Sequence, residues 1–178
     1  LIAMNPAALK ATLPRLKQGG MIIIDNDKFQ LKELKKLGFL DNPLTDGTLD
    51  AYRVINIPIT SLTLSATESS GLSRAKSRKC KNMFALGVVF WLFERPYSQT
   101  FDWIGTKYKE NENVAHANQA AFKAGYDFAI TTELLSEHYY IEPAQFPNGR
   151  YKQLTGNTAF SLGCVAASYL ANRPLFIG

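Results

Sequence analysis

The sequence predicts an α/β fold, in which a mostly parallel sheet carries helices on both faces. The first observation is a continuous apolar run at 21–24 that ends in Asp25, a pattern typical of a strand buried on both faces of a parallel sheet. The second is an apolar run at 1–4 followed at once by Asn5-Pro6, a helix N-cap with proline at the first helical position. A strand, a helix and a second strand in direct succession make a βαβ unit.

Further elements of this fold follow along the chain. Apolar residues at helical spacing predict a first helix over 7–16 and a short surface helix over 28–37. A third strand is expected at 52–57, where a proline ends it. The stretch at 61–77 is rich in serine and threonine and lacks clear periodicity.

The next segment is helical and unusually apolar. Residues 82–94 are apolar almost all round, so we expect this helix to be covered by the rest of the protein or by a partner. Two more helices are predicted at 98–109 and 114–126. Gly125 is interpreted as the cap that ends the second of them.

A change in composition divides the chain into domains. Residues 142–153 carry two prolines and an Asn-Gly turn without a helical period, which indicates a linker. We therefore expect one domain over 1–141 and the start of a second α/β domain over 154–178. The last residues, 175–178, are expected to form a strand. An apolar opening without an initiator methionine and an early stop in the second domain indicate a sequence truncated at both ends.

Composition excludes several classes of protein. The apolar runs are too short or too interrupted to span a hydrocarbon core of about 30 Å, and no signal peptide opens the chain, so we expect no membrane association and a cytoplasmic location. Cys80 and Cys164 stand alone, which excludes an iron–sulfur cluster or structural zinc site built from this chain. No metal site is expected. Nucleic-acid binding would need a longer basic face with interleaved aromatic residues.

One stretch concentrates positive charge. Residues 74–81 hold five of the 20 lysines and arginines, just before the apolar helix, where the helix dipole disfavours positive charge. One interpretation is an anion site at the helix start. Its members would be Arg78, Lys79, Lys81 and the amide of Asn82. The alternative is a solvated basic loop, or one that pairs with acidic groups of a partner subunit.

Three stretches, taken together, resemble a known family. They are residues 1–9 (LIAMNPAAL), 81–93 (KNMFALGVVFWLF) and 149–167 (GRYKQLTGNTAFSLGCVAA). Their order and spacing resemble the alpha subunits of 2-oxoacid:ferredoxin oxidoreductases in which a gamma-type domain is fused ahead of a pyrimidine-binding domain. The resemblance implies that the first expected domain is gamma-type, without its first βα unit, and that the second is the start of the pyrimidine-binding domain.

The resemblance also implies an activity. Such an enzyme oxidatively decarboxylates a 2-oxoacid, and 2-oxoglutarate is the substrate associated with the fused form. Thiamine diphosphate, magnesium and iron–sulfur clusters would be held elsewhere in the complete enzyme, and coenzyme A would accept the acyl group as cosubstrate. The implied partners are the beta subunit and ferredoxin or a similar acceptor, in a hetero-oligomer.

The same resemblance limits what this sequence is expected to do. The family's Gly-rich turn and its Tyr-Pro-Ile-Thr-Pro segment near the thiamine are absent, so we expect no catalytic residue here and no activity from this chain alone. The gamma-type region of similar enzymes is associated with coenzyme A. The resemblance therefore implies that the phosphates of coenzyme A are the ligand of the anion site described above. The other hypothesis is a non-catalytic gamma-type module that serves assembly or binds coenzyme A.

Overall fold

The chain divides into two units. The computed structural model describes residues 1–132 and 137–176. Contacts between residues separate the compact units Leu1–Ile141 and Glu142–Gly178. Their identification as a gamma-type domain and the beginning of a pyrimidine-binding domain stays a prediction.

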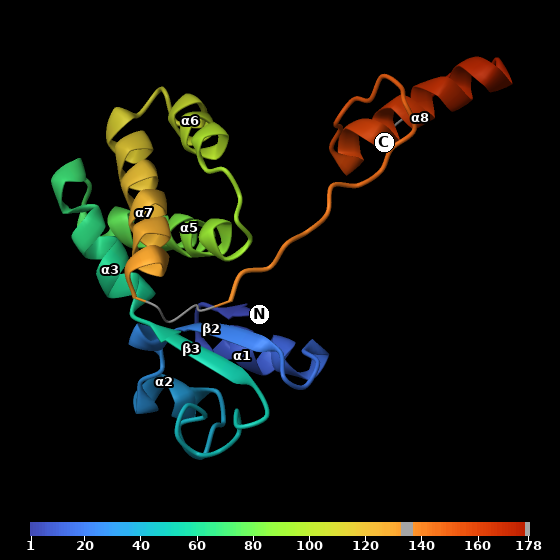
Figure 1. Ribbon diagram of the computed structural model, residues 1–178. Coiled ribbons are helices and arrows are strands. Elements are labelled where there is room, and N and C mark those ends of the chain that lie inside the picture. The colour runs from blue at the N-terminus through green and yellow to red at the C-terminus, as the bar shows by residue number, and fades with distance from the viewer. Residues whose placement is uncertain (133–136, 177–178) are drawn as a thin grey trace. The chain divides into compact units, whose positions relative to one another are not determined.

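The first unit is built on a parallel sheet. Its three strands are β1 (Ile2–Ala3), β2 (Met21–Asp25) and β3 (Arg53–Ile57), and they lie in the order β1-β2-β3 (Figure 1). In the parallel register, Ile23 of β2 is level with Ile2 on one side and with Ile55 on the other. The three predicted strands and their parallel arrangement are confirmed.

One face of the sheet carries the two helices that connect the strands. These are α1 (Pro6–Thr12) and α2 (Leu31–Lys36). Ile22 and Ile24 of β2 point to this face and are fully buried in a core that includes Leu9 of α1 and Leu34 of α2. Alternate residues of β2 therefore serve alternate faces, as the two-residue period of a strand requires.

The opposite face is covered by helices that come later in the chain. Ile23 and Ile55 point to this side, where they meet a core formed by α3 (Ile59–Ala66), α5 (Lys81–Leu92) and α7 (Glu112–Thr131). Figure 1 shows these helices on the side of the sheet away from α1 and α2. The expectation of helices on both faces is confirmed.

The apolar helix α5 is covered by the rest of the first unit. None of residues 83–93 is exposed, and Phe90 and Trp91 are both half-buried. Phe84 and Val88 are buried in the core beneath α7.

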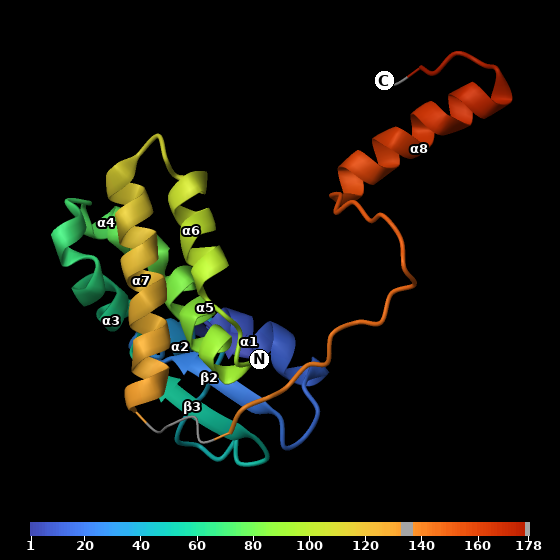
Figure 2. The same ribbon diagram turned by 45° about the horizontal axis from the view of Figure 1, so that its top comes forward.

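α6 (Ser98–Lys107) packs beside α7 (Figure 2). Short helical turns complete the unit: η1 (Leu13–Arg15), η2 (Asn26–Lys28), η3 (Glu68–Ser70), α4 (Arg74–Ser77) and η4 (Arg78–Cys80).

The stretch 61–77 lacks clear periodicity in sequence, yet α3, η3 and α4 occupy much of it. The local sequence lacks a start signal for α3, because Pro58 stands at the N-cap and its side chain has no atom that could accept a hydrogen bond. The caps come instead from Asp25 and Asp27, 35 and 34 residues upstream. A cap that is brought in by the tertiary fold leaves no mark in the local sequence.

The predicted helix end at Gly125 is wrong. α7 continues past Gly125 to Thr131, and the glycine allows α7 to lie against α5. A Cβ atom on Gly125 would be 1.9 Å from the carbonyl oxygen of Phe84, and one on Gly87 would be 2.1 Å from that of Phe122. The two glycines thus let the two backbones approach directly.

The second unit contains a single helix among its described residues. This is α8 (Gly156–Ala171), which begins where the Thr155 hydroxyl accepts a hydrogen bond from the amide of Thr158 and ends at Asn172, in the left-handed conformation. The expected strand at 175–178 is not seen at 175–176, and its last two residues lie outside the described residues.

Replacement of Gly125 by alanine should destabilise the first unit by about 3 kcal/mol or more, because the new Cβ atom would overlap a backbone carbonyl that cannot move aside. Urea unfolding followed by circular dichroism measures this. Gly163→Ala is the control: it too lies within a helix, but its added Cβ meets nothing within 4 Å, so the midpoint should stay or rise slightly. Equal midpoints for the two variants would contradict the close helix crossing.

Candidate functional site

The carboxyl edge of the sheet gathers charged and polar side chains around a buried carboxylate. Open α/β sheets bind ligands at this edge. Asp25 is the last residue of β2 and is fully buried. Its Oδ1 accepts a hydrogen bond of 3.1 Å from the amide of Thr60, and its Oδ2 accepts one of 2.6 Å from the Thr60 hydroxyl. A buried charge also needs a counter-ion nearby.

Lys81 supplies that counter-ion. Its ammonium lies 3.6 Å from Oδ2 of Asp25 and donates a hydrogen bond of 3.3 Å to the carbonyl oxygen of Met4. The Lys81 side chain is 21% exposed, so most of it lies within the protein. One lysine on the first turn of α5 therefore contacts the carboxyl ends of both β1 and β2.

Asp27 supplies a second carboxylate that, like Asp25, accepts hydrogen bonds from the first turn of α3. Asp27 accepts hydrogen bonds from the amide of Ser61 at 2.7 Å and from its hydroxyl at 2.9 Å. With Thr60 bonded to Asp25, two consecutive amides of the first turn of α3 face negative charge. This arrangement satisfies amides that have no partner within the helix and suits the positive end of its dipole.

The four residues predicted to hold an anion are separated by the structure. Lys81 is turned toward Asp25, whereas Arg78, Lys79 and Asn82 are exposed. Within the described part of the chain, neither Arg78 nor Lys79 forms an ion pair. Two exposed cationic side chains, which closely precede Lys81 in the sequence, thus remain available for an external anion.

The basic stretch is helical and is not a loop. The backbone is helical at Ser77, Arg78, Cys80 and Lys81, so that α4, η4 and α5 follow one another without a break. The amide of Asn82 therefore lies within helical backbone instead of at an open helix start. The positive charges of Arg78 and Lys79 become the main feature that could hold an anion here.

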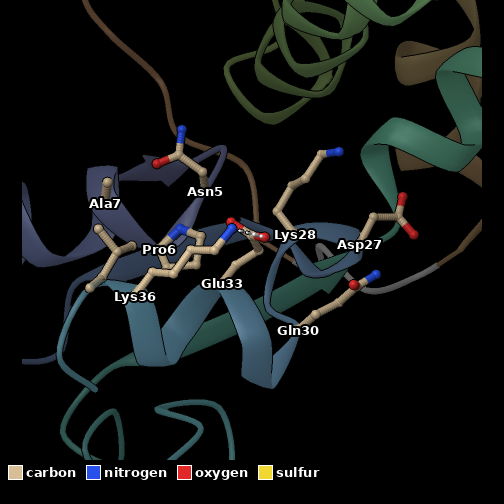
Figure 3. Close-up of a pocket in the computed structure, with 9 residues that line it drawn as sticks. Asn5, Pro6, Ala7, Asp27, Lys28, Gln30, Glu33 and Lys36 are labelled. Atoms are coloured by element: carbon tan, nitrogen blue, oxygen red, sulfur yellow. Dashed lines mark hydrogen bonds and ion pairs between the residues drawn. The ribbon is translucent and has the colours of Figure 1, made fainter.

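A cavity of about 590 Å³ adjoins the carboxyl ends of β1 and β2 (Figure 3). Asn5 lies on its wall and caps α1, accepting a hydrogen bond of 2.8 Å from the amide of Ala8. Glu33 and Lys36 pair with each other across 2.9 Å. The lining residues are Asn5, Pro6, Ala7, Asp27, Lys28, Gln30, Glu33, Lys36 and Leu37.

Sequence reasoning missed the cavity and the role of Asp25. The available signal was an acidic residue at the end of a fully apolar strand, which must find partners when the strand is buried. The identity of those partners, Thr60 and Lys81, depends on how α3 and α5 return to the sheet. That information is not local.

The described residues do not fit a metal ion or an iron–sulfur cluster. Across 1–132 and 137–176, no three His, Cys, Asp or Glu residues come together as a metal site. Both cysteines are free: Cys80 is buried in the first unit, and Cys164 belongs to α8 of the second. In the same residues no helix is long and apolar enough to cross a membrane.

Known proteins resemble this chain in sequence and fold. Residues 1–128 match a family described as pyruvate ferredoxin/flavodoxin oxidoreductase. The chain is 42% identical over its 178 residues to the 2-oxoglutarate oxidoreductase subunit KorA of Mycobacterium tuberculosis, and it spans 27% of that relative's length.

A solved structure shows the same fold. It is a 2-oxoglutarate:ferredoxin oxidoreductase from Magnetococcus marinus with 2-oxoglutarate, coenzyme A and succinyl-CoA bound. The TM-score is 0.56 at 21% identity, over 81% of this chain and 22% of that one. At this identity the likeness concerns the fold alone.

Replacement of Lys81 by methionine should cost roughly 3 kcal/mol of stability, because it leaves the Asp25 carboxylate buried without a counter-ion. The double variant Asp25→Asn/Lys81→Met should recover more than half of the loss. Lys123→Met, which breaks an exposed Lys–Asp pair on α7, is the matched control and should cost less than about 1 kcal/mol. Equal losses for Lys81→Met and Lys123→Met in urea unfolding would contradict the buried pair.

The two cysteines should differ in reactivity. Burial raises the pKa of the Cys80 thiol, so that less thiolate is present at pH 8, and the side chain is also out of reach of reagents. Cys164 is half-buried and should react with iodoacetamide at least roughly ten times faster. Mass spectrometry of partially alkylated protein gives both rates, and similar rates would show that Cys80 is accessible.

Proposed function

Because the chain belongs to the pyruvate ferredoxin/flavodoxin oxidoreductase family, we propose that it is part of the alpha subunit of a 2-oxoglutarate:ferredoxin oxidoreductase. The observation that carries this proposal is the 42% identity to a 2-oxoglutarate oxidoreductase subunit over all 178 residues. The chain spans about a quarter of that relative, so the activity is that of a larger assembly.

The proposed reaction converts 2-oxoglutarate, coenzyme A and two oxidised ferredoxins into succinyl-CoA, carbon dioxide, a proton and two reduced ferredoxins. Thiamine diphosphate with magnesium would supply the carbanion chemistry and iron–sulfur clusters the electron transfer. We assign these groups to other parts of the enzyme, including a beta subunit. Free thiols at Cys80 and Cys164 favour a cytoplasmic enzyme.

The two units have separate proposed roles. The unit Leu1–Ile141 would be the gamma-type domain, and the segment after the linker would begin the pyrimidine-binding domain. α8 supports a larger second domain, because most of its large apolar side chains are exposed in the described chain. These include Phe160, Leu162, Val165, Tyr169 and Leu170.

Within the first unit, we propose that Arg78 and Lys79 hold phosphates of coenzyme A, with the exposed side chain of Asn82 beside them. Both cations are exposed and form no ion pair in the described part of the chain, and they closely precede Lys81, which contacts the sheet edge where such folds bind ligands. Guanidinium and ammonium groups form strong, charge-assisted hydrogen bonds with phosphate. The competing role for the same surface is contact with acidic groups of another subunit.

The full-length subunit, purified together with its beta subunit, tests the function. Ferredoxin reduction should require both 2-oxoglutarate and coenzyme A, and one succinyl-CoA should form for every two ferredoxins reduced. Pyruvate serves as the comparison substrate and should be used at least roughly tenfold less efficiently, a difference of about 1.4 kcal/mol. Equal or better use of pyruvate would overturn the substrate assignment, and a purified complex without oxidoreductase activity would favour the assembly module.

In that enzyme the double substitution Arg78→Ala/Lys79→Ala should raise the KM for coenzyme A at least roughly tenfold, more at low salt than at high, because it removes two charged phosphate contacts. The KM for 2-oxoglutarate should stay within about twofold. Lys107→Ala/Lys109→Ala, at the carboxyl end of α6, is the matched control for loss of two exposed lysines. An unchanged KM for coenzyme A with weaker subunit assembly would instead make the stretch a subunit contact.

A further inference from the structure

We propose that Lys81 does not bind the anion but is a positioning residue, which with Asp25 and Thr60 fixes the basic stretch at the carboxyl edge of the sheet. This inference rests on the proposed coenzyme A site. It divides the four residues of that site into cations that contact phosphate, Arg78 and Lys79, and a cation that serves the fold.

The buried carboxylate of Asp25 needs a counter-ion within the fold. Its side chain is fully buried, and both carboxylate oxygens are engaged by Thr60. These hydrogen bonds stabilise the charge without neutralising it. Among the described residues, the Lys81 ammonium is the cation that forms an ion pair with this carboxylate. If Lys81 turned outward to a ligand, Asp25 would stay buried with no counter-ion, which is strongly unfavourable.

The Lys81 ammonium is held by contacts on two of its sides. An ammonium has three donor hydrogens. One side of this ammonium faces Asp25 and another donates to the carbonyl oxygen of Met4, and the side chain is only 21% exposed. Lys81 is therefore oriented by contacts at the ends of two strands, whereas Arg78 and Lys79 are exposed and have no ionic partner in the described chain.

The contact between Lys81 and Asp25 also fixes the backbone of the basic stretch. Arg78 lies three residues before Lys81 in continuous helical backbone, so both side chains leave the helix on a similar side. Cys80, between Lys79 and Lys81, is buried in the core that contains Phe84. With Lys81 tied to the strands and Cys80 in the core, the backbone that carries Arg78 and Lys79 has a fixed place relative to the sheet.

A mutant cycle in the full-length enzyme separates a positioning residue from a ligand. Lys81→Met should raise the KM for coenzyme A at least roughly tenfold, with kcat and the KM for 2-oxoglutarate within about twofold. The double variant Asp25→Asn/Lys81→Met should return the KM for coenzyme A to within about threefold of the parent, because no buried charge is left unpaired. Lys81→Arg, which keeps a cation next to Asp25, should lie close to the parent.

Other outcomes overturn the proposal in distinguishable ways. If the double variant keeps the raised KM for coenzyme A, Lys81 contacts the phosphate itself. If Lys81→Met leaves this KM unchanged while Arg78→Ala/Lys79→Ala raises it, phosphate binding by Arg78 and Lys79 does not depend on the contact between Lys81 and Asp25. If neither variant changes it but ferredoxin reduction persists, the coenzyme A site lies elsewhere, although the proposed reaction stands.

Two controls protect this test against general damage. Lys123→Met removes a lysine from an exposed ion pair on α7 and should leave all kinetic constants unchanged. If Lys81→Met does not assemble, the double variant and Lys81→Arg still decide the matter, because a phosphate-binding Lys81 predicts a raised KM for the double variant. Calorimetry with coenzyme A on the same preparations gives the binding constant independently of turnover.

Discussion

A single buried carboxylate constrains much of this molecule. Asp25 ends β2, and its partners bring the amino end of α3 and the first turn of α5 to the carboxyl edge of the sheet. Because an unpaired buried charge is far less stable than a paired one, α3 and α5 cannot shift along the sheet independently. These contacts set the position of the basic stretch, and therefore the position of the proposed coenzyme A site.

The parts of the fold that the sequence predicts are those with local causes. The run at 21–25 shows a buried strand, and Asn5-Pro6 shows a capped helix, because each pattern follows from the residues themselves. α3 escapes prediction because Asp25 and Asp27 cap it from a distance. The helix end predicted at Gly125 is wrong because a tertiary contact also decides the role of this residue. Glycine favours helix ends, yet here it permits a close crossing with α5.

The candidate site divides in the same way. Sequence identifies the density of charge at 74–81, and the resemblance supplies a ligand for it, but neither can say which cations face solvent. Lys81 lies only two residues from Lys79, yet one pairs with a buried carboxylate and the other is exposed. The helical backbone through η4 sets that difference, and it also removes the open helix start expected at Asn82.

Amide hydrogen exchange in the full-length enzyme, with and without coenzyme A, tests the central claim most directly. The account predicts that coenzyme A slows exchange in residues 74–82 of the parent enzyme but not in residues 98–109, and that Lys81→Met weakens this protection. Exchange at 74–82 that is unaffected by saturating coenzyme A, with protection appearing in another part of the enzyme, would contradict it.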